Sequence, residues 1–220
     1  MGHRACVSPM LRIIGTSGKA SARDFEASFV SSANAIVHAD ADLLAALAGK
    51  PVFAVGDRTA ASAKAAGLPF VHSASGDRHS LAEIIDERMP IGSRLLYLAG
   101  RPHKVDLVRA LRAKGFLVQS IEIYRSIPIR ELEVATRRLI SARNVDAVLH
   151  YSQLSASAFC DTLANEDLMR ELRALSHCCL SEDVAAPLLA VGAKVIFVAA
   201  RPDEASLFAT LDQVHVCPSE

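Results

Sequence analysis

Neither charge predominates in this sequence: Lys and Arg together number 24, Asp and Glu together number 24, and the formal net charge is zero. Proteins that bind nucleic acid or membrane surfaces usually carry a basic excess, so this balance disfavours both classes. No apolar run reaches the roughly 18 residues of a membrane-spanning helix. We therefore expect no nucleic-acid partner and no membrane partner, and an anionic ligand would have to be held by local groups.

Motifs for metals, redox chemistry and nucleotides are also missing. The five cysteines show no C-x-x-C spacing and the eight histidines no H-E-x-x-H, so we expect no metal and no cofactor. An odd number of cysteines, with no signal-peptide core at the N-terminus, favours the reducing cytoplasm. Neither G-x-G-x-x-G nor a P-loop occurs, which disfavours a nucleotide-dependent enzyme with a doubly wound fold.

Short apolar runs alternate with helical patterns in a chain that is 51% hydrophobic. The apolar runs predict strands at 4–8, 27–31, 51–55, 68–72, 94–98, 116–124, 146–151, 176–180 and 194–199. The helical patterns predict helices at 33–48, 58–66, 79–88, 103–114, 130–142, 154–164, 166–173, 182–191 and 203–213. Runs such as "AVLHY" are apolar on both faces, as in strands covered by helices on both sides. The alternation predicts an α/β fold with parallel sheets.

The chain also repeats itself. Residues 52–85 align with residues 177–211: each segment contains a strand, a polar turn, a helix with paired alanines, a glycine, a second strand and a last helix. The glycines, Gly67 and Gly192, are expected to end their helices in the left-handed conformation. "SFVSSANAI" similarly matches "LHYSQLSASAF". The repeat predicts two similar α/β lobes.

A third match concerns the N-terminus. "GFLVQSIEIYRS", from Gly115, aligns with "GHRACVSPMLRI", from Gly2, and residues 94–113 form a strand and a helix before the first of these segments only. We therefore expect a βα unit of about 20–25 residues to be missing ahead of Met1. The alternative is an asymmetric protein that never had this unit.

Polar turns follow several predicted strands. In parallel sheets a ligand lies beyond the carboxyl ends of the strands, and clefts between lobes are favoured ligand sites. The turns at these ends are Ser31-Ser32, Gly56-Asp57, Gly100-Arg101, Tyr151-Ser152 and Ser181-Glu182. A helix that begins at such a turn presents free N–H groups, which bind phosphate or carboxylate. Any single turn is better explained as an ordinary N-cap, but for the set of turns at one cleft we expect a ligand with several anionic groups.

Other side chains near these turns have open roles. Arg101 and Lys104 could pair with substrate carboxylates or belong to a solvated loop. Asp57 is expected to be an N-cap rather than a base, because a carboxylate repels an anion. Tyr124 could donate a hydrogen bond to a leaving hydroxyl, or could be an amphipathic tyrosine at the edge of the core.

The motifs "SSANAI", "VFAVGDRTAASAKAAG", "SGDRHSLAEII", "LLYLAGRPHK", "AKGFLVQSIEIY" and "YSQLSASAF" resemble, in order and spacing, those of the uroporphyrinogen-III synthase family. The resemblance implies two α/β lobes, 1–14 plus 127–220 and 15–126, joined by extended connectors near 8–16 and 121–129, with a cleft between the lobes. It also implies closure of hydroxymethylbilane to uroporphyrinogen III, with inversion of the last pyrrole ring and loss of water. The family works as a monomer without a metal or an organic cofactor.

The resemblance further implies a set of site residues. Tyr124 is the implied acid for departure of the hydroxyl, and the implied substrate-binding residues are Ser31, Ser32, Asn34, Gly56, Thr59, Gly100, Arg101, Lys104, Tyr151, Ser152 and Ser181. The second-half counterpart of "VGDRT" reads "CLSEDV" and departs from the family pattern, because Ser181 replaces the glycine and Val184 the threonine. Only Ser181 is carried over at that turn. The alternative function is a noncatalytic two-lobed binding protein for a small anionic ligand.

Overall fold

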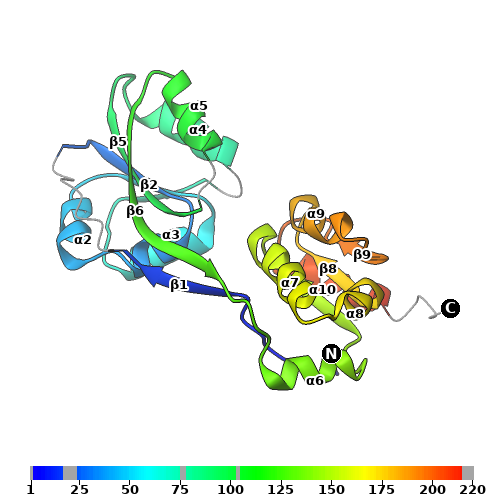
Figure 1. Ribbon diagram of the computed structural model, residues 1–220. Helices are drawn as coiled ribbons and strands as arrows, with labels where there is room; N and C mark the ends of the chain where they lie inside the picture. Colours follow the sequence, from blue (N-terminus) through cyan, green and yellow to red (C-terminus); the bar gives the residue numbers. More distant parts are fainter. Residues whose placement is uncertain (1, 17–23, 75–77, 103–104, 215–220) are drawn as a thin grey trace. The chain divides into compact units, whose positions relative to one another are not determined.

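Figure 1 shows the computed structural model of the protein, which describes residues 2–16, 24–74, 78–102 and 105–214. The chain divides into two compact units. One is Ile13–Ser126, here called the continuous unit; the other is Met1–Arg12 together with Ile127–Glu220, here called the discontinuous unit. Within the described ranges, no helix combines the length and the apolar character needed to cross a membrane.

Strands and helices alternate along both units. The strands and helices up to the second crossing between the units are β1 (Leu11–Gly15), β2 (Ala27–Val30), α1 (Ala33–Val37), α2 (Ala41–Ala48), β3 (Val52–Ala54), α3 (Asp57–Ala65), β4 (Val71–Ser73), α4 (Arg78–Arg88), β5 (Arg94–Arg101), α5 (Asp106–Ala113) and β6 (Leu117–Pro128). Those that follow are α6 (Val134–Ser141), β7 (Ala147–His150), α7 (Gln153–Asn165), α8 (Met169–Ala174), β8 (Ser176–Cys179), α9 (Glu182–Ala190), β9 (Val195–Val198), α10 (Glu204–Ala209) and α11 (Leu211–Val214).

The continuous unit is built on a six-stranded sheet with the order β1-β6-β5-β2-β3-β4. The pairs β2-β3, β2-β5, β3-β4 and β5-β6 are parallel. β1 runs antiparallel to β6, because the N–H of Thr16 donates to the carbonyl of Ile123 (2.8 Å) while the N–H of Ile129 donates to that of Met10 (2.9 Å). The chain thus passes between the two units twice, along paired extended segments.

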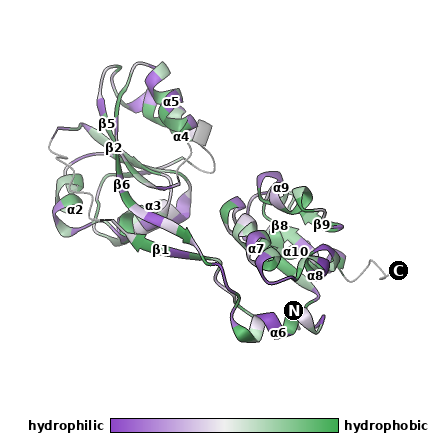
Figure 2. Cartoon of the chain, in the orientation of Figure 1, coloured by the Kyte–Doolittle hydropathy of each residue, from purple (hydrophilic) through white to green (hydrophobic). Residues whose placement is uncertain are grey.

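Helices cover both faces of this sheet (Figure 1). Because successive strand residues point to opposite faces, β5 contributes to two separate cores. Leu96 and Leu98 pack with α1, α2 and α3, whereas Leu95 and Tyr97 pack with α4 and α5. In Figure 2, α5 carries both hydrophobic and hydrophilic colours, as expected for a helix with one face on the sheet and one in water.

The discontinuous unit contains a three-stranded parallel sheet, β7-β8-β9. Phe159 and Leu163 of α7 and Leu188 of α9 form a core on one face, and Leu207 of α10 packs on the other. The order matches β2-β3-β4, with two helices between the first two strands and one between the next two in each unit, as expected for an internal repeat. Among the described residues β7 pairs only with β8, whereas its counterpart β2 lies between β5 and β3.

The predicted α/β fold with parallel sheets is confirmed, and Gly67 and Gly192 have the expected positive φ, 84° and 81°. The strand predicted at 4–8 is wrong: residues 2–10 form no strand, and the first strand is β1. The single helix predicted at 33–48 is also wrong. The Asp40 carboxylate accepts the N–H of Leu43 (2.8 Å) and caps a new helix, so α1 and α2 are separate. Residues 203–213 likewise divide into α10 and α11.

Candidate active site

The carboxyl ends of four neighbouring strands in the continuous unit carry predicted site residues. β3, β2, β5 and β6 are adjacent and parallel, with Val30 level with Ala54 of β3 and Leu98 of β5. The ends of β3, β2 and β5, together with the part of β6 that lies beside the end of β5, are therefore at one edge of the sheet, here called the carboxyl edge. The predicted residues that this edge brings together are Ser31, Ser32, Asn34, Gly56, Thr59, Gly100, Arg101 and Tyr124.

The turn between β2 and α1 holds two serines in different ways. Ser31 Oγ lies 2.8 Å from the hydroxyl of Tyr97, a buried residue whose ring stacks on Phe29 with centroids 4.6 Å apart. Ser32 is the N-cap of α1, and its Oγ accepts the N–H of Asn34 (3.3 Å). Tyr97 was not predicted as a site residue; its only signal is that it is the one polar-tipped side chain in the apolar run "LLYLAG".

The turn between β3 and α3 leaves a helix start without a side-chain cap. Gly56 is the N-cap, with φ 77° and ψ 157°, and none of the described side chains caps the helix. The N–H groups of the first turn are therefore available to a ligand, next to the largely buried Thr59. The expectation that Asp57 caps this helix is wrong. Asp57 is the first helical residue, and its carboxylate accepts a hydrogen bond from the Ser73 hydroxyl (2.7 Å).

Two arginines surround one carboxylate where β5 ends beside β6. Glu122 accepts hydrogen bonds from Nε and an Nη of Arg125 (3.1 and 2.7 Å), and a guanidinium nitrogen of Arg101 lies 3.6 Å away. The side chains of Arg101 and Arg125 are 65% and 48% exposed, so both retain donors for an anionic ligand. Lys104 lies outside the described residues.

Tyr124 lies against β5 with only 9% of its surface exposed. Its ring centroid is 6.3 Å from that of His38, the C-cap residue of α1, and the two planes differ by 27°. Within the described part of the chain, no residue forms a hydrogen bond with the Tyr124 hydroxyl. Buried tyrosines usually have such a partner, so this phenol is available to a ligand.

The discontinuous unit carries the other predicted residues, at the ends of the neighbouring strands β7 and β8. Ser152 caps α7: its Oγ accepts the N–H of Ser155 (3.2 Å) and lies 2.8 Å from the Ser155 hydroxyl. The half-exposed Tyr151 donates to Glu204 (3.1 Å), and partial burial together with this bond raises the pKa of Tyr151. Ser181 occupies the N-cap position of α9, but its side chain makes no cap hydrogen bond.

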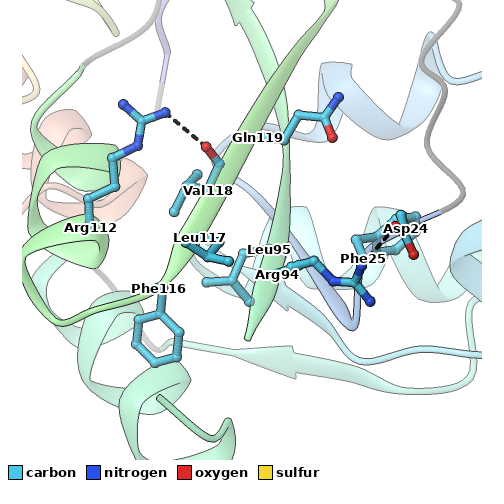
Figure 3. A pocket seen from close by; sticks show the side chains of 9 residues that line it. All are labelled: Asp24, Phe25, Arg94, Leu95, Arg112, Phe116, Leu117, Val118 and Gln119. Carbon is cyan, nitrogen blue, oxygen red and sulfur yellow. Dashed lines mark hydrogen bonds and ion pairs between the residues drawn. The ribbon is translucent and has the colours of Figure 1, made fainter. Parts of the chain in front are cut away.

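A pocket at the opposite end of the sheet is not part of this site. It is lined by residues near the amino ends of β2, β5 and β6 (Figure 3). Its arginines already have partners in the chain: Arg94 pairs with Asp24 (2.8 Å), and Arg112 donates to the carbonyl of Val118 (2.8 Å). In the described ranges, no group of three or more His, Cys, Asp or Glu side chains is placed to hold a metal ion.

The sequence profile of the family described as Uroporphyrinogen-III synthase HemD matches residues 1–209. No individual curated protein matches significantly by sequence alone. In structure, the chain is similar to the uroporphyrinogen-III synthetase of Helicobacter pylori, with a TM-score of 0.70, 15% identity, and coverage of 93% of this chain and 91% of that chain. It is also similar to a mutant uroporphyrinogen III synthase of Thermus thermophilus, with a TM-score of 0.58, 18% identity, and coverage of 94% and 88%.

The structural likenesses, at such low identities, show the fold. The family profile reaches further, because it covers nearly the whole sequence, including all the turns at the strand ends. The chain therefore belongs to the uroporphyrinogen-III synthase family.

Proposed function

We propose that this chain catalyses the reaction of its family, the closure of hydroxymethylbilane to uroporphyrinogen III with inversion of ring D and loss of water. The family consists of cofactor-independent cyclising lyases of haem biosynthesis. The observation that carries the proposal is the match of the family profile over residues 1–209. The location of polar turns and a buried, available phenol at the carboxyl edge supports it.

The substrate is a polyacid, and we propose that helix starts hold its side chains. Acetate and propionate groups on every ring give about eight carboxylates, all ionised at neutral pH. The start of α3 is suited to one of them, because Gly56 leaves the first N–H groups without a side-chain cap and Thr59 adds a hydroxyl. Ser32 accepts a cap hydrogen bond, but its own hydrogen remains free to donate, so capping and substrate binding are compatible.

Tyr124 is the residue that we propose to act on the leaving group. The adjacent pyrrole nitrogen pushes the hydroxyl out, and the phenol donates a hydrogen bond or proton to it, so that water leaves and an azafulvene cation forms. The substituted carbon of ring D then attacks this cation and gives a spiro intermediate. The original bond between that carbon and the methylene of ring C breaks and leaves a second azafulvene cation on ring C. The free α-carbon of ring D attacks this cation, and loss of its proton completes the inverted ring. Since unassisted closure gives the uninverted isomer, the protein acts chiefly by positioning the chain of rings.

The remaining substrate-binding residues, the bounds of the lobes, the oligomeric state and the cellular location are also proposals. We propose that Asn34, Gly100, Arg101, Lys104, Tyr151, Ser152 and Ser181 also contribute to substrate binding. We propose lobes of 1–14 plus 127–220 and 15–126, each carrying one set of turns, and a monomer that works in the cytoplasm without a nucleic-acid partner. The balanced charge and the odd number of cysteines support these inferences.

Incubation with freshly made hydroxymethylbilane tests the function directly. The products are oxidised and the isomers I and III are separated; a synthase gives mainly isomer III. Buffer alone and heat-denatured protein are the controls, and both should give isomer I. If the folded protein produced only isomer I, the proposed function would be refuted.

A further inference from the structure

Gly100 and Tyr124 are register partners, and an irregularity brings them together. β5 and β6 pair regularly as far as Ala99 and Glu122, but the next pair is Gly100 with Tyr124. Ile123 is therefore an extra residue in β6, which makes this point a β-bulge. In a regular strand, neighbouring residues point to opposite faces. Here Ile123 and Tyr124 both join the core beneath α1, α2 and α3, as expected where a bulge re-aims a side chain.

The missing side chain of Gly100 provides the space that the Tyr124 ring occupies. Leu96 and Leu98 of β5 face the core that contains Tyr124, and Gly100 is the next residue in this alternation. A Cβ atom built on Gly100 would overlap Cζ and the hydroxyl oxygen of Tyr124 and would lie 2.6 Å from its Cε1. The phenol end of the ring thus lies directly on the Gly100 backbone.

His38 lies near this ring as well, and is itself close to a second glycine. A Cβ on Gly15 would lie 3.1 Å from Nδ1 of His38, so the imidazole lies close to the β1 backbone while its other side faces Tyr124. The phenol is located by backbone and rings, because no hydrogen bond from a described residue fixes its hydroxyl. Any side chain at position 100 would therefore move the hydroxyl.

We propose that Gly100, besides its backbone belonging to the substrate-binding turn, is a positioning residue: its lack of a side chain sets the place of the Tyr124 hydroxyl. The inference deepens the proposed function and depends on it, because the hydroxyl matters only if Tyr124 assists the leaving group. It also explains why a glycine occupies position 100 although this residue is not one of the positive-φ glycines of the chain. The reason is the close approach of a ring rather than backbone conformation.

Gly100→Ala should leave the fold intact but displace the phenol of Tyr124. The atoms that meet the new methyl group belong to the far end of a side chain, which can rotate away, and not to backbone. Gly49→Ala is the matched control, since a Cβ there meets nothing within 4 Å and φ is −91°. If Gly100→Ala fails to fold, Gly100→Ala combined with Tyr124→Ala should fold, because the ring is gone. Failure of both variants to fold would show a backbone requirement and refute the inference.

The position of the Tyr124 ring can be followed by NMR, independently of any enzyme assay. The chain has three tyrosines and no tryptophan, so protein labelled with 3-fluorotyrosine gives a simple fluorine NMR spectrum. Tyr124→Phe identifies the Tyr124 resonance by its loss. Gly100→Ala should shift this resonance, and Gly49→Ala should leave it in place. An unmoved resonance in Gly100→Ala would overturn the packing argument.

Kinetics with hydroxymethylbilane then test the role. Gly100→Ala should lower kcat roughly 10- to 100-fold, at or below the low end of the roughly 100- to 10,000-fold that a general acid contributes, because the pyrrole nitrogen supplies most of the driving force. KM should change little, and adding Gly100→Ala to Tyr124→Phe should cause no further loss, since the hydroxyl is already absent. Losses that multiply, or a normal kcat in Gly100→Ala, would refute the positioning role. An unsubstituted protein that forms no isomer III would instead refute the proposed function.

Discussion

Acidification should destabilise the discontinuous unit through a pair of buried histidines. His150 at the end of β7 and His177 of β8 are 4% and 0% exposed, and their rings share a hydrogen bond of 3.0 Å between Nε2 and Nδ1. His177 Nε2 lies 2.9 Å from the carbonyl of Leu172, which can only accept. His177 therefore carries its proton on Nε2, and His150 Nε2 donates to the free Nδ1. The two hydrogen bonds require a neutral His177, and burial disfavours the charged form of His150.

The size of the effect follows from the pKa shifts. Burial, and then the neighbouring His177, lower the pKa of His150 from 6.5 to about 3, and burial lowers that of His177 as well. Folding therefore favours the neutral form of His150. Its contribution to the free energy of unfolding is fully present above pH 6.5 and is lost as the pH falls from 6.5 towards 3. At about pH 5, His150 alone accounts for a loss of about 2 kcal/mol relative to neutral pH.

Hydrogen exchange measures this loss locally. Protection of the β7 and β8 amides, corrected for the intrinsic pH dependence of exchange, should fall about 30-fold between about pH 7.5 and about pH 5, because each 1.4 kcal/mol is a factor of ten. The amides of β2, in the other unit, serve as an internal reference. His150→Gln keeps a donor for His177 but cannot take up a proton, so its protection should depend less on pH; His3→Gln, at an exposed position, is the control. Equal pH dependence in His150→Gln and the unsubstituted protein would refute the argument.

Three further changes have defined outcomes. Tyr124→Phe should slow turnover in the isomer assay without abolishing it, and a folded but wholly inactive variant would contradict the mechanism. Glu122→Gln removes the carboxylate that competes for Arg101 and Arg125, so KM should fall by up to about fivefold, the equivalent of one surface ion pair; a higher KM would count against a role for these arginines. Asp40→Ala should lower the free energy of unfolding by about 1 kcal/mol in urea titrations with unchanged kcat, because only the cap of α2 is lost.

Sequence patterns correctly predicted the strands and helix ends that depend only on neighbouring residues. Apolar runs predicted the buried parallel strands, and Gly67 and Gly192 predicted the helix ends, because a left-handed residue needs no distant partner. The segment 4–8 was predicted from the same kind of pattern, but it pairs with none of the strands in the described ranges, and pairing is not encoded in the segment itself. The break near Asp40 could have been found, since "HADAD" interrupts the apolar periodicity and contains Asp40, a residue type that favours N-caps.

The site was predictable to the level of turns, and no further. The strand-then-turn pattern identifies Ser31, Gly56 and Gly100 as residues at strand ends. The contact of Ser31 with Tyr97, and of Gly100 with Tyr124, depends on the register of strands that are far apart in the sequence. A bulge shifts that register by one residue, and such a shift cannot be read from spacing alone.

The two halves of the repeat differ in the carboxylates next to the N–H groups at their helix starts. This difference bears on where the substrate is held. At α3 the one carboxylate of the first turn, Asp57, is engaged by the Ser73 hydroxyl, and Gly56 leaves the N–H groups open. At α9 the first turn contains both Glu182 and Asp183, which favour the same positive helix end that a ligand carboxylate would use. We therefore expect the start of α3 to have a higher affinity for an anion than the start of α9. Since the available phenol and both exposed arginines also lie at the carboxyl edge of the continuous unit, we infer that this unit holds the reacting end of the substrate.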